Sequence, residues 1–478
     1  MHGRTNFSPV GHRRRSLPLT KVEKETVQNV PVEKVHYSKD EYNLILPHDA
    51  TPCASEGSNF DKMLLQRWNE AKRSGALQYD LNLLYKTLPG KFGLSAQLNM
   101  ERATHRRKPH SFRSMNEPFD TRRFNFTKIS SNEILFELCC ENTRSSNDAS
   151  PAPSVPPVHR SEEKSADDML TVDSSAGVTC TAQSTSLAVP AILTNSQRSV
   201  VIVNNSPIEK GHSLLVPLID KHLPQRITFD GFKLAVETML LSSCRLFFIV
   251  YNSLLGHASV NHLHFHLYYW PYISRIVTWP VTHVCWTLYS LDSWLIPGFV
   301  LQLQNHDIDE FVKQVVSLTQ FFHQKNIAHN MFMARAPCLS LLEKKRTRQG
   351  EQDCHGQNHF KNSMETASGN AEHNDLSEEA RRDNEEAARL REAPLYTTVY
   401  IFPRKAVFGA KPTMNFTPAA CECAGHLLIY TSAFFQAVHE ARIVHIVEEE
   451  ACLEEGVFDQ LTKELKKHTA FCSPLMTE

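Results

Sequence analysis

The chain has 478 residues, more than one hydrophobic core usually holds, so one large or two medium-sized folding units are expected. Apolar residues make up 41% of it, and Lys+Arg (51) nearly equal Asp+Glu (52), which gives a net charge of −1. This balance excludes a strong overall attraction to polyanions. Neither nucleic acid nor a membrane surface is therefore an expected partner.

The twelve cysteines are scattered and form no C-x-x-C pair. The closest groupings, Cys139-Cys140 and Cys421-Glu422-Cys423, fit neither a zinc knuckle nor a thioredoxin-like motif, which favours reduced thiols in a cytoplasmic protein. The most apolar window, from Leu240 to Leu255, is interrupted by Arg245 and is too short to span a bilayer. A basic stretch at Arg13-Arg14-Arg15 fits either a transit peptide or a disordered leader. We predict a cytoplasmic, soluble protein.

The first part of the chain, residues 1–57, has no sustained apolar period and is predicted to be a disordered leader. Order is expected to begin with a helix from Phe60 to Trp68, where apolar residues follow helical spacing. The alternation from Ile134 to Leu138 predicts a strand. Two polar tracts, residues 141–190 and 344–393, are predicted to be disordered insertions.

Between these tracts, strand and helix patterns alternate. A helix is predicted over Phe232–Leu240, with strands at Ser199–Val203, Gly211–Pro217, Leu246–Tyr251 and Val260–Trp270. Beyond residue 301, a helix over Asp309–Gln324 and a strand near Thr397–Phe402 predict a second α+β unit. Hairpin-length gaps between the strands favour an α+β fold with an antiparallel sheet and flanking helices.

The strongest chemical signal is an alternation of histidines with apolar residues. On a strand, His262, His264 and His266 would share one face at about 6.7 Å per step, while Leu263 and Phe265 would face a core. Three interpretations are open at this point. The histidines could be exposed by chance, they could hold zinc with a further ligand from elsewhere, or one of them could attack a phosphate.

Residues upstream of the histidines favour attack on a phosphate. A neutral imidazole can attack phosphorus when a hydrogen bond to its other nitrogen fixes the tautomer, and neighbouring histidines can orient it or protonate a leaving oxygen. Asn252 lies at the end of the preceding predicted strand, and Gly256 and Ser259 follow in the turn. A small donor and close backbone approach both suit phosphate oxygens.

The run from Asn252 to His266 resembles the signature of the histidine-triad superfamily, and most closely its GDP-D-glucose and GDP-L-galactose phosphorylase family. Further segments are similar to that family: Phe60–Trp68, Leu88–Gly93, Pro118–Asp120, Phe124–Lys128, Ser206–His212 and, more weakly, Gly425–Leu427 to Glu440–Ala441. The resemblance covers roughly residues 60 to 465 apart from the two insertions.

The resemblance implies a histidine-triad-like fold with two related halves, as in galactose-1-phosphate uridylyltransferase. Residues 58–300 would form the catalytic half and residues 301–478 the second half. It also implies phosphorolysis of GDP-D-glucose to glucose 1-phosphate and GDP, with no cofactor and no metal. Both substrates are small molecules, and the oligomeric state stays open.

The resemblance also assigns roles to single residues. His264 matches the histidine that becomes guanylylated, and His262 the one that orients it. Asn252 and Ser259 match positions that hold the α-phosphate, and His212 is similar to a histidine that lines the site. Plant relatives usually carry Gln where this chain has His266. We therefore expect His266 to hydrogen-bond the transferring phosphoryl group.

A basic segment between the matched segments could supply positive charge to the site. Its members are Arg102, His105, Arg106, Arg107, Lys108 and Arg113. We predict that Lys108 or Arg113 clamps phosphate oxygens, although a solvated loop would look the same. The segment lacks interleaved aromatic residues, which disfavours nucleic-acid binding. Two other functions stay open: a nucleotide hydrolase that uses water in place of phosphate, and a non-enzymatic zinc-binding protein.

Overall fold

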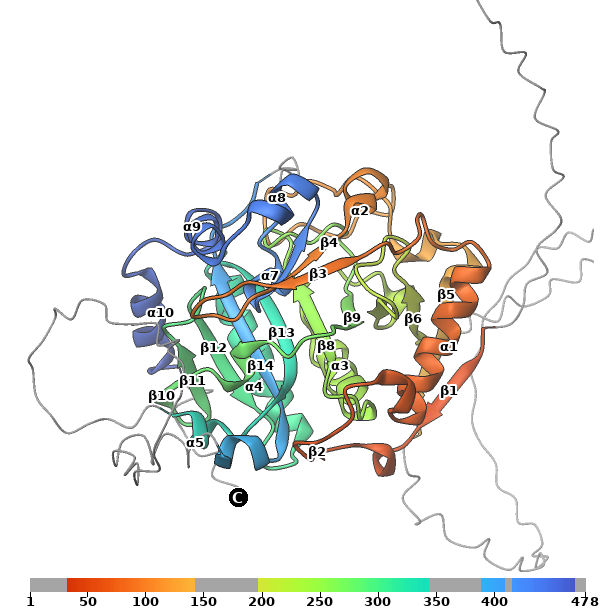
Figure 1. Cartoon of the computed structure of the whole chain (residues 1–478). Helices are drawn as coiled ribbons and strands as arrows, with labels where there is room; N and C mark the ends of the chain where they lie inside the picture. Colours follow the sequence, from red (N-terminus) through yellow and green to blue (C-terminus); the bar gives the residue numbers. More distant parts are fainter. Residues whose placement is uncertain (1–31, 142–196, 344–387, 409–414, 469–478) are drawn as a thin grey trace, which may run out of the picture.

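The computed structural model describes residues 32–141, 197–343, 388–408 and 415–468 (Figure 1). Most of the two predicted insertions, and residues 1–31 of the predicted leader, lie outside these ranges. Within them, strands and helices are mixed, and one large sheet runs across the molecule. The predicted α+β class is confirmed.

The large sheet has twelve strands. In spatial order they are β1 (Lys34–Tyr37), β5 (Ile134–Cys140), β6 (Ser199–Val203), β7 (Ser213–Val216), β9 (Phe265–Tyr269), β8 (Phe247–Asn252), β13 (Ala328–Ala336), β14 (Leu395–Arg404), β12 (Gly298–Gln302), β11 (Leu288–Leu291) and β10 (Thr282–Cys285), with β2 (Ile45–Leu46) paired to β14. All pairs are antiparallel except β1 with β5. The predicted antiparallel pairing is thus correct for all but one edge pair.

Two long helices cover one face of this sheet. α3 (Phe229–Leu241) and α4 (Ile308–Gln324) pack against each other and against β8 and β13. Each begins at a residue whose side chain accepts a hydrogen bond from the first turn: Thr228 from Gly231 N and Asp307 from Glu310 N. On the same face, α1 (Asn59–Arg73) packs against β5, and its Phe60 ring lies 5.8 Å from the Phe247 ring of β8.

A small sheet covers the opposite face of the central strands. It consists of β15 (His426–Ile429), β4 (Ser95–Leu98) and β3 (Leu84–Thr87). The His426 ring stacks on Trp270 with centroids 4.9 Å apart and lies 5.0 Å from the Phe248 ring of β8. α7 (Ala420–Cys423) adds contacts to β8 and β13 on this side. Further helices are α2 (Met100–His105), α5 (Leu339–Leu342), α8 (Ser432–Ala437), α9 (Glu440–Glu450) and α10 (Val457–Leu465).

Two predictions about order along the chain need correction. Residues 32–57 were expected to belong to a disordered leader, but they contain β1, β2 and two short 3-10 helices. β1 is a short edge strand whose order comes from pairing with β5 and from the buried Tyr37 hydroxyl, which donates to Glu237 at 2.8 Å. The predicted strand Val260–Trp270 forms only from Phe265 onward, so His262 and His264 lie in the segment that leads into β9.

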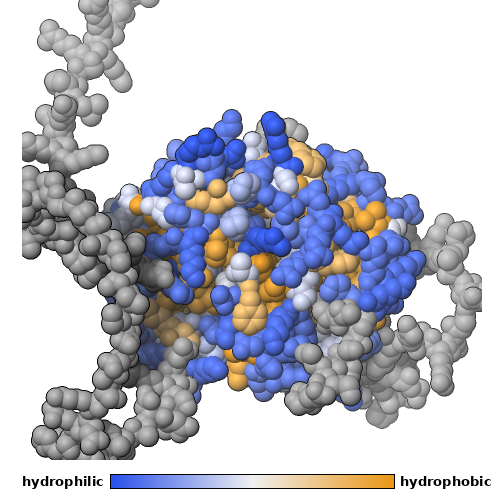
Figure 2. All heavy atoms as spheres, turned by 180° about the vertical axis from the view of Figure 1, so that it is seen from behind, coloured by the Kyte–Doolittle hydropathy of each residue, from blue (hydrophilic) through white to orange (hydrophobic). Residues whose placement is uncertain are grey.

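The surface seen in Figure 2 is mainly hydrophilic, with small apolar areas between the polar side chains. Across the described part of the chain, none of the helices combines the length and the apolar character needed to cross a bilayer.

Candidate active site

The three histidines lie where β9 begins, beside the end of β8, on the sheet face opposite α3 and α4. His266 on β9 pairs with Val250 on β8 and Leu214 on β7. The buried carboxamide of Gln225 holds the segment in place, because it accepts from His264 N at 2.9 Å and donates to the His264 and Asn252 carbonyls. The start of β9 is thereby fixed to the end of β8.

His264 is held as a neutral ring with one free nitrogen. Its Nδ1 lies 2.7 Å from the backbone oxygen of His262. A carbonyl can only accept, so Nδ1 carries the proton and Nε2 keeps its lone pair. Burial, and to a smaller extent Arg107, lower the pKa of His264 to about 4, while that hydrogen bond acts in the opposite direction. The ring is therefore neutral at neutral pH, and its Nε2 carries an unshared electron pair.

His262 orients its neighbour through its backbone, while its own ring is packed against aromatic side chains. Nδ1 accepts from Phe126 N at 3.2 Å, and the ring lies 5.1 Å from Phe119 and 5.5 Å from Phe126. Burial lowers the pKa of His262 to about 3, so this ring is neutral as well. The His262 carbonyl, rather than its imidazole, is the group that contacts the His264 ring through a hydrogen bond.

His212 determines which nitrogen of His266 carries the proton. Ile208 N donates to His212 Nδ1 at 2.9 Å, so His212 must be protonated on Nε2. That nitrogen lies 3.0 Å from His266 Nδ1 and donates to it, which leaves His266 Nε2 as an N–H donor. Burial lowers the pKa of both rings well below the ordinary value.

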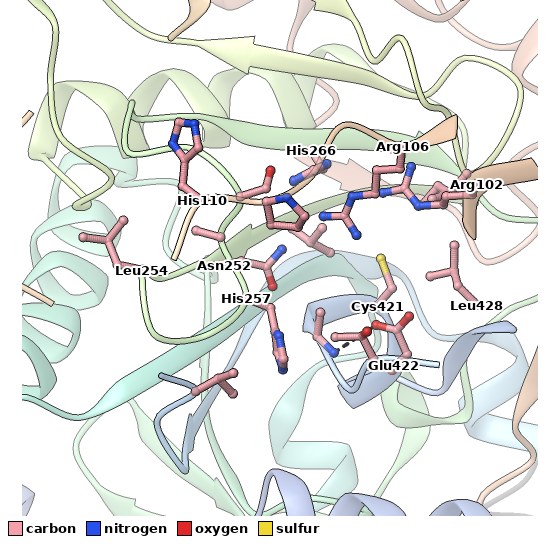
Figure 3. A pocket seen from close by; sticks show the side chains of 18 of the residues that line it. Arg102, Arg106, His110, Asn252, Leu254, His257, His266, Cys421, Glu422 and Leu428 are labelled. Atoms are coloured by element: carbon pink, nitrogen blue, oxygen red, sulfur yellow. Dashed lines mark hydrogen bonds between the residues drawn. The ribbon is translucent and has the colours of Figure 1, made fainter. Parts of the chain in front are cut away.

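Two adjoining cavities of about 110 Å³ and about 100 Å³ open beside the histidines. Both are lined by Arg102, Arg106, Ser259 and His266. The first also includes His212, Asn252, His257 and Glu422 (Figure 3), and the second includes His264, Phe124, Phe126 and Glu133. Among the predicted residues, the structure thus gathers His212, Asn252, Ser259, His264 and His266 around one cleft.

Asn252 presents its amide nitrogen to the cleft. Its Oδ1 accepts from Asn330 Nδ2 at 2.7 Å and from Ala420 N at 3.0 Å, which orients the side chain and leaves Nδ2 for a ligand. Gly256, which was predicted to approach the phosphate, lines neither cavity. A Cβ at Gly256 would lie 2.8 Å from the His329 backbone oxygen, so the glycine allows the turn to approach β13.

The structure does not place the two predicted cationic residues at the cavities. Lys108 and Arg113 are exposed and line neither cavity, whereas Arg102 and Arg106 line both. Asn99 caps α2 by accepting from Arg102 N, and the four-residue spacing then turns Arg102 and Arg106 to the same side. Lys108 follows the end of this helix and leaves that side. The helical spacing of the two arginines was the signal that could have found them.

Sequence reasoning missed residues that the C-terminal half supplies. Glu422 on α7 lines the first cavity, with one carboxylate oxygen accepting from Ala419 N at 3.1 Å. Burial raises the pKa of Glu422 to about 7. Asn330 on β13 and Arg404 on β14 lie behind the Asn252 turn and hold it. These residues are far from the histidines in sequence, so no local pattern links them.

A buried neutral imidazole that lines a cavity together with guanidinium groups suits an enzyme that transfers a phosphorus-centred group. A family model described as "GDPGP1-like, N-terminal domain" matches residues 59–161 and 174–268, which include all three histidines. GDP-D-glucose phosphorylase 1 of Caenorhabditis elegans is 34% identical over 451 residues, covering 90% of this chain and 75% of that protein. The chain belongs to the GDP-D-glucose phosphorylase family.

Two more distant similarities accompany this match. GDP-L-galactose phosphorylase 2 of Arabidopsis thaliana is 32% identical over 212 residues, 44% of this chain and 41% of the plant protein. The crystal structure of yeast Ap4A phosphorylase Apa2 aligns with 85% of this chain and 99% of its own, at 10% identity and a TM-score of 0.43.

Proposed function

We propose that this chain is a GDP-hexose phosphorylase that transfers GMP from GDP-D-glucose to phosphate through a guanylyl intermediate on His264. The observation that carries the proposal is the hydrogen bond from His264 Nδ1 to the His262 carbonyl, which leaves Nε2 unprotonated in a ring that lines the second cavity. The choice of GDP-D-glucose as substrate and of phosphate as acceptor follows the name of the relatives, GDP-D-glucose phosphorylase 1.

In the first step, His264 Nε2 attacks the α-phosphorus, and the bond from that phosphorus to the bridging oxygen breaks. Hexose 1-phosphate leaves as a dianion, and the imidazole carries the guanylyl group as a cation that still donates from Nδ1 to the His262 carbonyl. Asn252 Nδ2, the Ser259 hydroxyl and His266 Nε2–H would donate to the oxygens of the transferring group. Such fixed donors stabilise charge that grows in the transition state.

In the second step, an oxygen of hydrogen phosphate attacks the same phosphorus, and the bond to His264 Nε2 breaks. The electron pair returns to the imidazole, and GDP leaves with the proton that the phosphate brought. No external base is needed, because the attacking dianion has a free lone pair and the leaving group is a neutral ring.

Product analysis separates this function from a hydrolase. With GDP-glucose and phosphate, we expect GDP and glucose 1-phosphate in equal amounts, and His264→Asn should give neither. Release of GMP rather than GDP at millimolar phosphate would instead identify a hydrolase.

A zinc-binding protein remains the non-enzymatic alternative. Over the described ranges, no three His, Cys, Asp or Glu side chains are grouped so as to hold a metal ion. Dialysis against EDTA is expected to leave the phosphorolysis rate unchanged. Stoichiometric zinc in the purified protein that is lost on His262 or His264 substitution would support the alternative.

We also infer that the large sheet consists of two related halves. Strands β6 and β7, helix α3 and strands β8 and β9 follow one another in the chain, and the strands lie in the order β6-β7-β9-β8. Strands β11 and β12, helix α4 and strands β13 and β14 repeat this succession and lie in the mirrored order β13-β14-β12-β11. The boundary would then fall before β10, near residue 281, rather than at residue 300. Failure of these halves to superimpose in an experimental structure would contradict the inference.

A cytoplasmic location belongs to the proposal as well. The described cysteines are free thiols, and burial raises the pKa of Cys244 and Cys423 to about 12, which makes them poor nucleophiles. A fluorescent fusion of the full chain should be spread through the cytoplasm, and accumulation in an organelle would contradict this part.

A further inference from the structure

Two arginines of the basic segment between Arg102 and Arg113 reach into the cleft beside the histidines. Arg102 on α2 is only 7% exposed, and one of its terminal nitrogens donates to the Ser206 carbonyl. Its Nε is buried and has no hydrogen-bond partner among the described residues. Arg106, one turn further, lines both cavities, and only its backbone forms a hydrogen bond in the described chain. Figure 3 shows the two guanidinium groups side by side at one edge of the cavity.

Glu422 is the acidic residue whose charge acts on these two arginines in the described chain, and it forms no salt bridge with either of them. Neither arginine forms a salt bridge with a carboxylate in the described ranges. Glu422 lies across the cavity in Figure 3, but a backbone N–H already binds its carboxylate, and burial raises its pKa to about 7. Burial and the neighbouring Arg102 lower the pKa of Arg106 to about 10, so it stays charged at neutral pH.

Two neighbouring like charges that are largely removed from water destabilise a fold, and an anion bound between them offsets this cost. Guanidinium groups match the oxygen geometry of phosphate and form charge-assisted hydrogen bonds to it. The pair lies next to His266 and Ser259, which line the same cavities. A dianionic phosphate bound there would therefore adjoin the transferring group.

We infer that Arg102 and Arg106 bind the β-phosphoryl group of the GDP-hexose and then, after hexose 1-phosphate has left, the inorganic phosphate that attacks the guanylyl intermediate. This inference rests on the proposed function. The leaving oxygen and the attacking oxygen both belong to phosphate dianions and occupy the same position relative to the α-phosphorus. Because two guanidinium groups bind a dianion more strongly than neutral water, the arginines favour phosphorolysis over hydrolysis.

The test compares Arg106→Gln with Arg113→Gln, a control from the same basic segment whose side chain is exposed and outside both cavities. We expect Arg106→Gln to raise the KM for phosphate at least tenfold and to increase the share of GMP over GDP among the products. Arg106→Lys should raise the KM for phosphate by less, because lysine keeps the positive charge but lacks the planar guanidinium that can bind two phosphate oxygens at once. Arg113→Gln should match the wild type.

The outcomes separate this inference from the proposed function. Arg106→Gln removes no hydrogen bond that its side chain makes within the described chain, so it is expected to fold, and a thermal melt checks this. If it does not fold, Arg106→Lys decides by the same KM. A KM for phosphate within twofold of the wild-type value in a folded variant would overturn the inference. Absence of any guanylyl adduct on the wild-type protein would instead overturn the proposed function.

Discussion

Replacing Asn330 with alanine should weaken both the fold and the reaction. Asn330 is fully buried on β13; its Nδ2 donates to Asn252 Oδ1 at 2.7 Å and to the Gly256 carbonyl at 2.6 Å, and its Oδ1 accepts from Arg404 at 3.0 Å. Two neutral hydrogen bonds contribute about 1 kcal/mol each, and one to a charged group about 2 kcal/mol. The loss of about 4 kcal/mol would shift the folding equilibrium roughly a thousandfold.

The same substitution frees the Asn252 side chain that would donate to the α-phosphate. Displacement of a positioning group by about 1 Å can cost roughly a hundredfold in rate, so kcat/KM for GDP-glucose should fall at least that far. Urea unfolding followed by tryptophan fluorescence measures the first effect, and steady-state kinetics below the transition measure the second. Asn132→Ala is the control, because that exposed side chain makes a single 3.5 Å hydrogen bond. An unfolding free energy within 1 kcal/mol of wild type, or unchanged kcat/KM, would refute the reasoning.

Three further predictions follow from the site. His212→Phe should lower kcat roughly tenfold to a hundredfold with little change in KM, because His266 would lose the donor that fixes its tautomer. His105→Asn is the control, because that side chain is exposed, and an equal loss of kcat in it would contradict the prediction. Since a proton on Nε2 blocks attack and the pKa of His264 is about 4, kcat/KM should stay level from pH 8 to about pH 5 and fall below pH 4; a fall centred near pH 6.5 would show an ordinary histidine. Lys108→Ala and Arg113→Ala should each keep kcat/KM within twofold of the wild-type value, because both side chains are exposed. A tenfold loss in either variant would show that the residue does act in the site.

Lowered pKa values of other buried histidines make the stability of the fold depend on pH. Burial lowers the pKa of His329 to about 4 and of His426 to about 3, so between pH 6.5 and 4 the unfolded chain takes up protons that these folded rings do not. The urea midpoint should therefore decrease as the pH falls through this window and stay level above pH 7. A midpoint that rises on acidification would contradict the assignment of neutral buried rings.

Local patterns were sufficient where local physics decides the structure. The helices α1, α3 and α4 and the strands β6, β8 and β14 follow from apolar periodicity within the segment itself. β1 was missed because an edge strand with one buried residue has no apolar alternation. β10 and β11 could not be predicted from local pattern, because Trp286 in the tight turn between them has φ 50°, a conformation that usually indicates glycine in a sequence.

The site divides in the same way. Alternation of histidines with buried apolar residues identified His264 and its neighbours, and the residues between them do enter the core. The orientation of that segment, however, comes from Gln225 in another loop, and the Asn252 turn is held by Asn330 and Arg404. A polar residue such as Asn330 within a buried strand is a detectable signal, but its partner can be known only from the folded chain.

Intact-protein mass spectrometry after brief incubation with GDP-glucose in phosphate-free buffer tests the central claim most directly. We expect a mass increase corresponding to one GMP on the wild-type protein and on His105→Asn, none on His264→Asn, and discharge to GDP when phosphate is added. No adduct and no glucose 1-phosphate from the folded wild-type protein would contradict it.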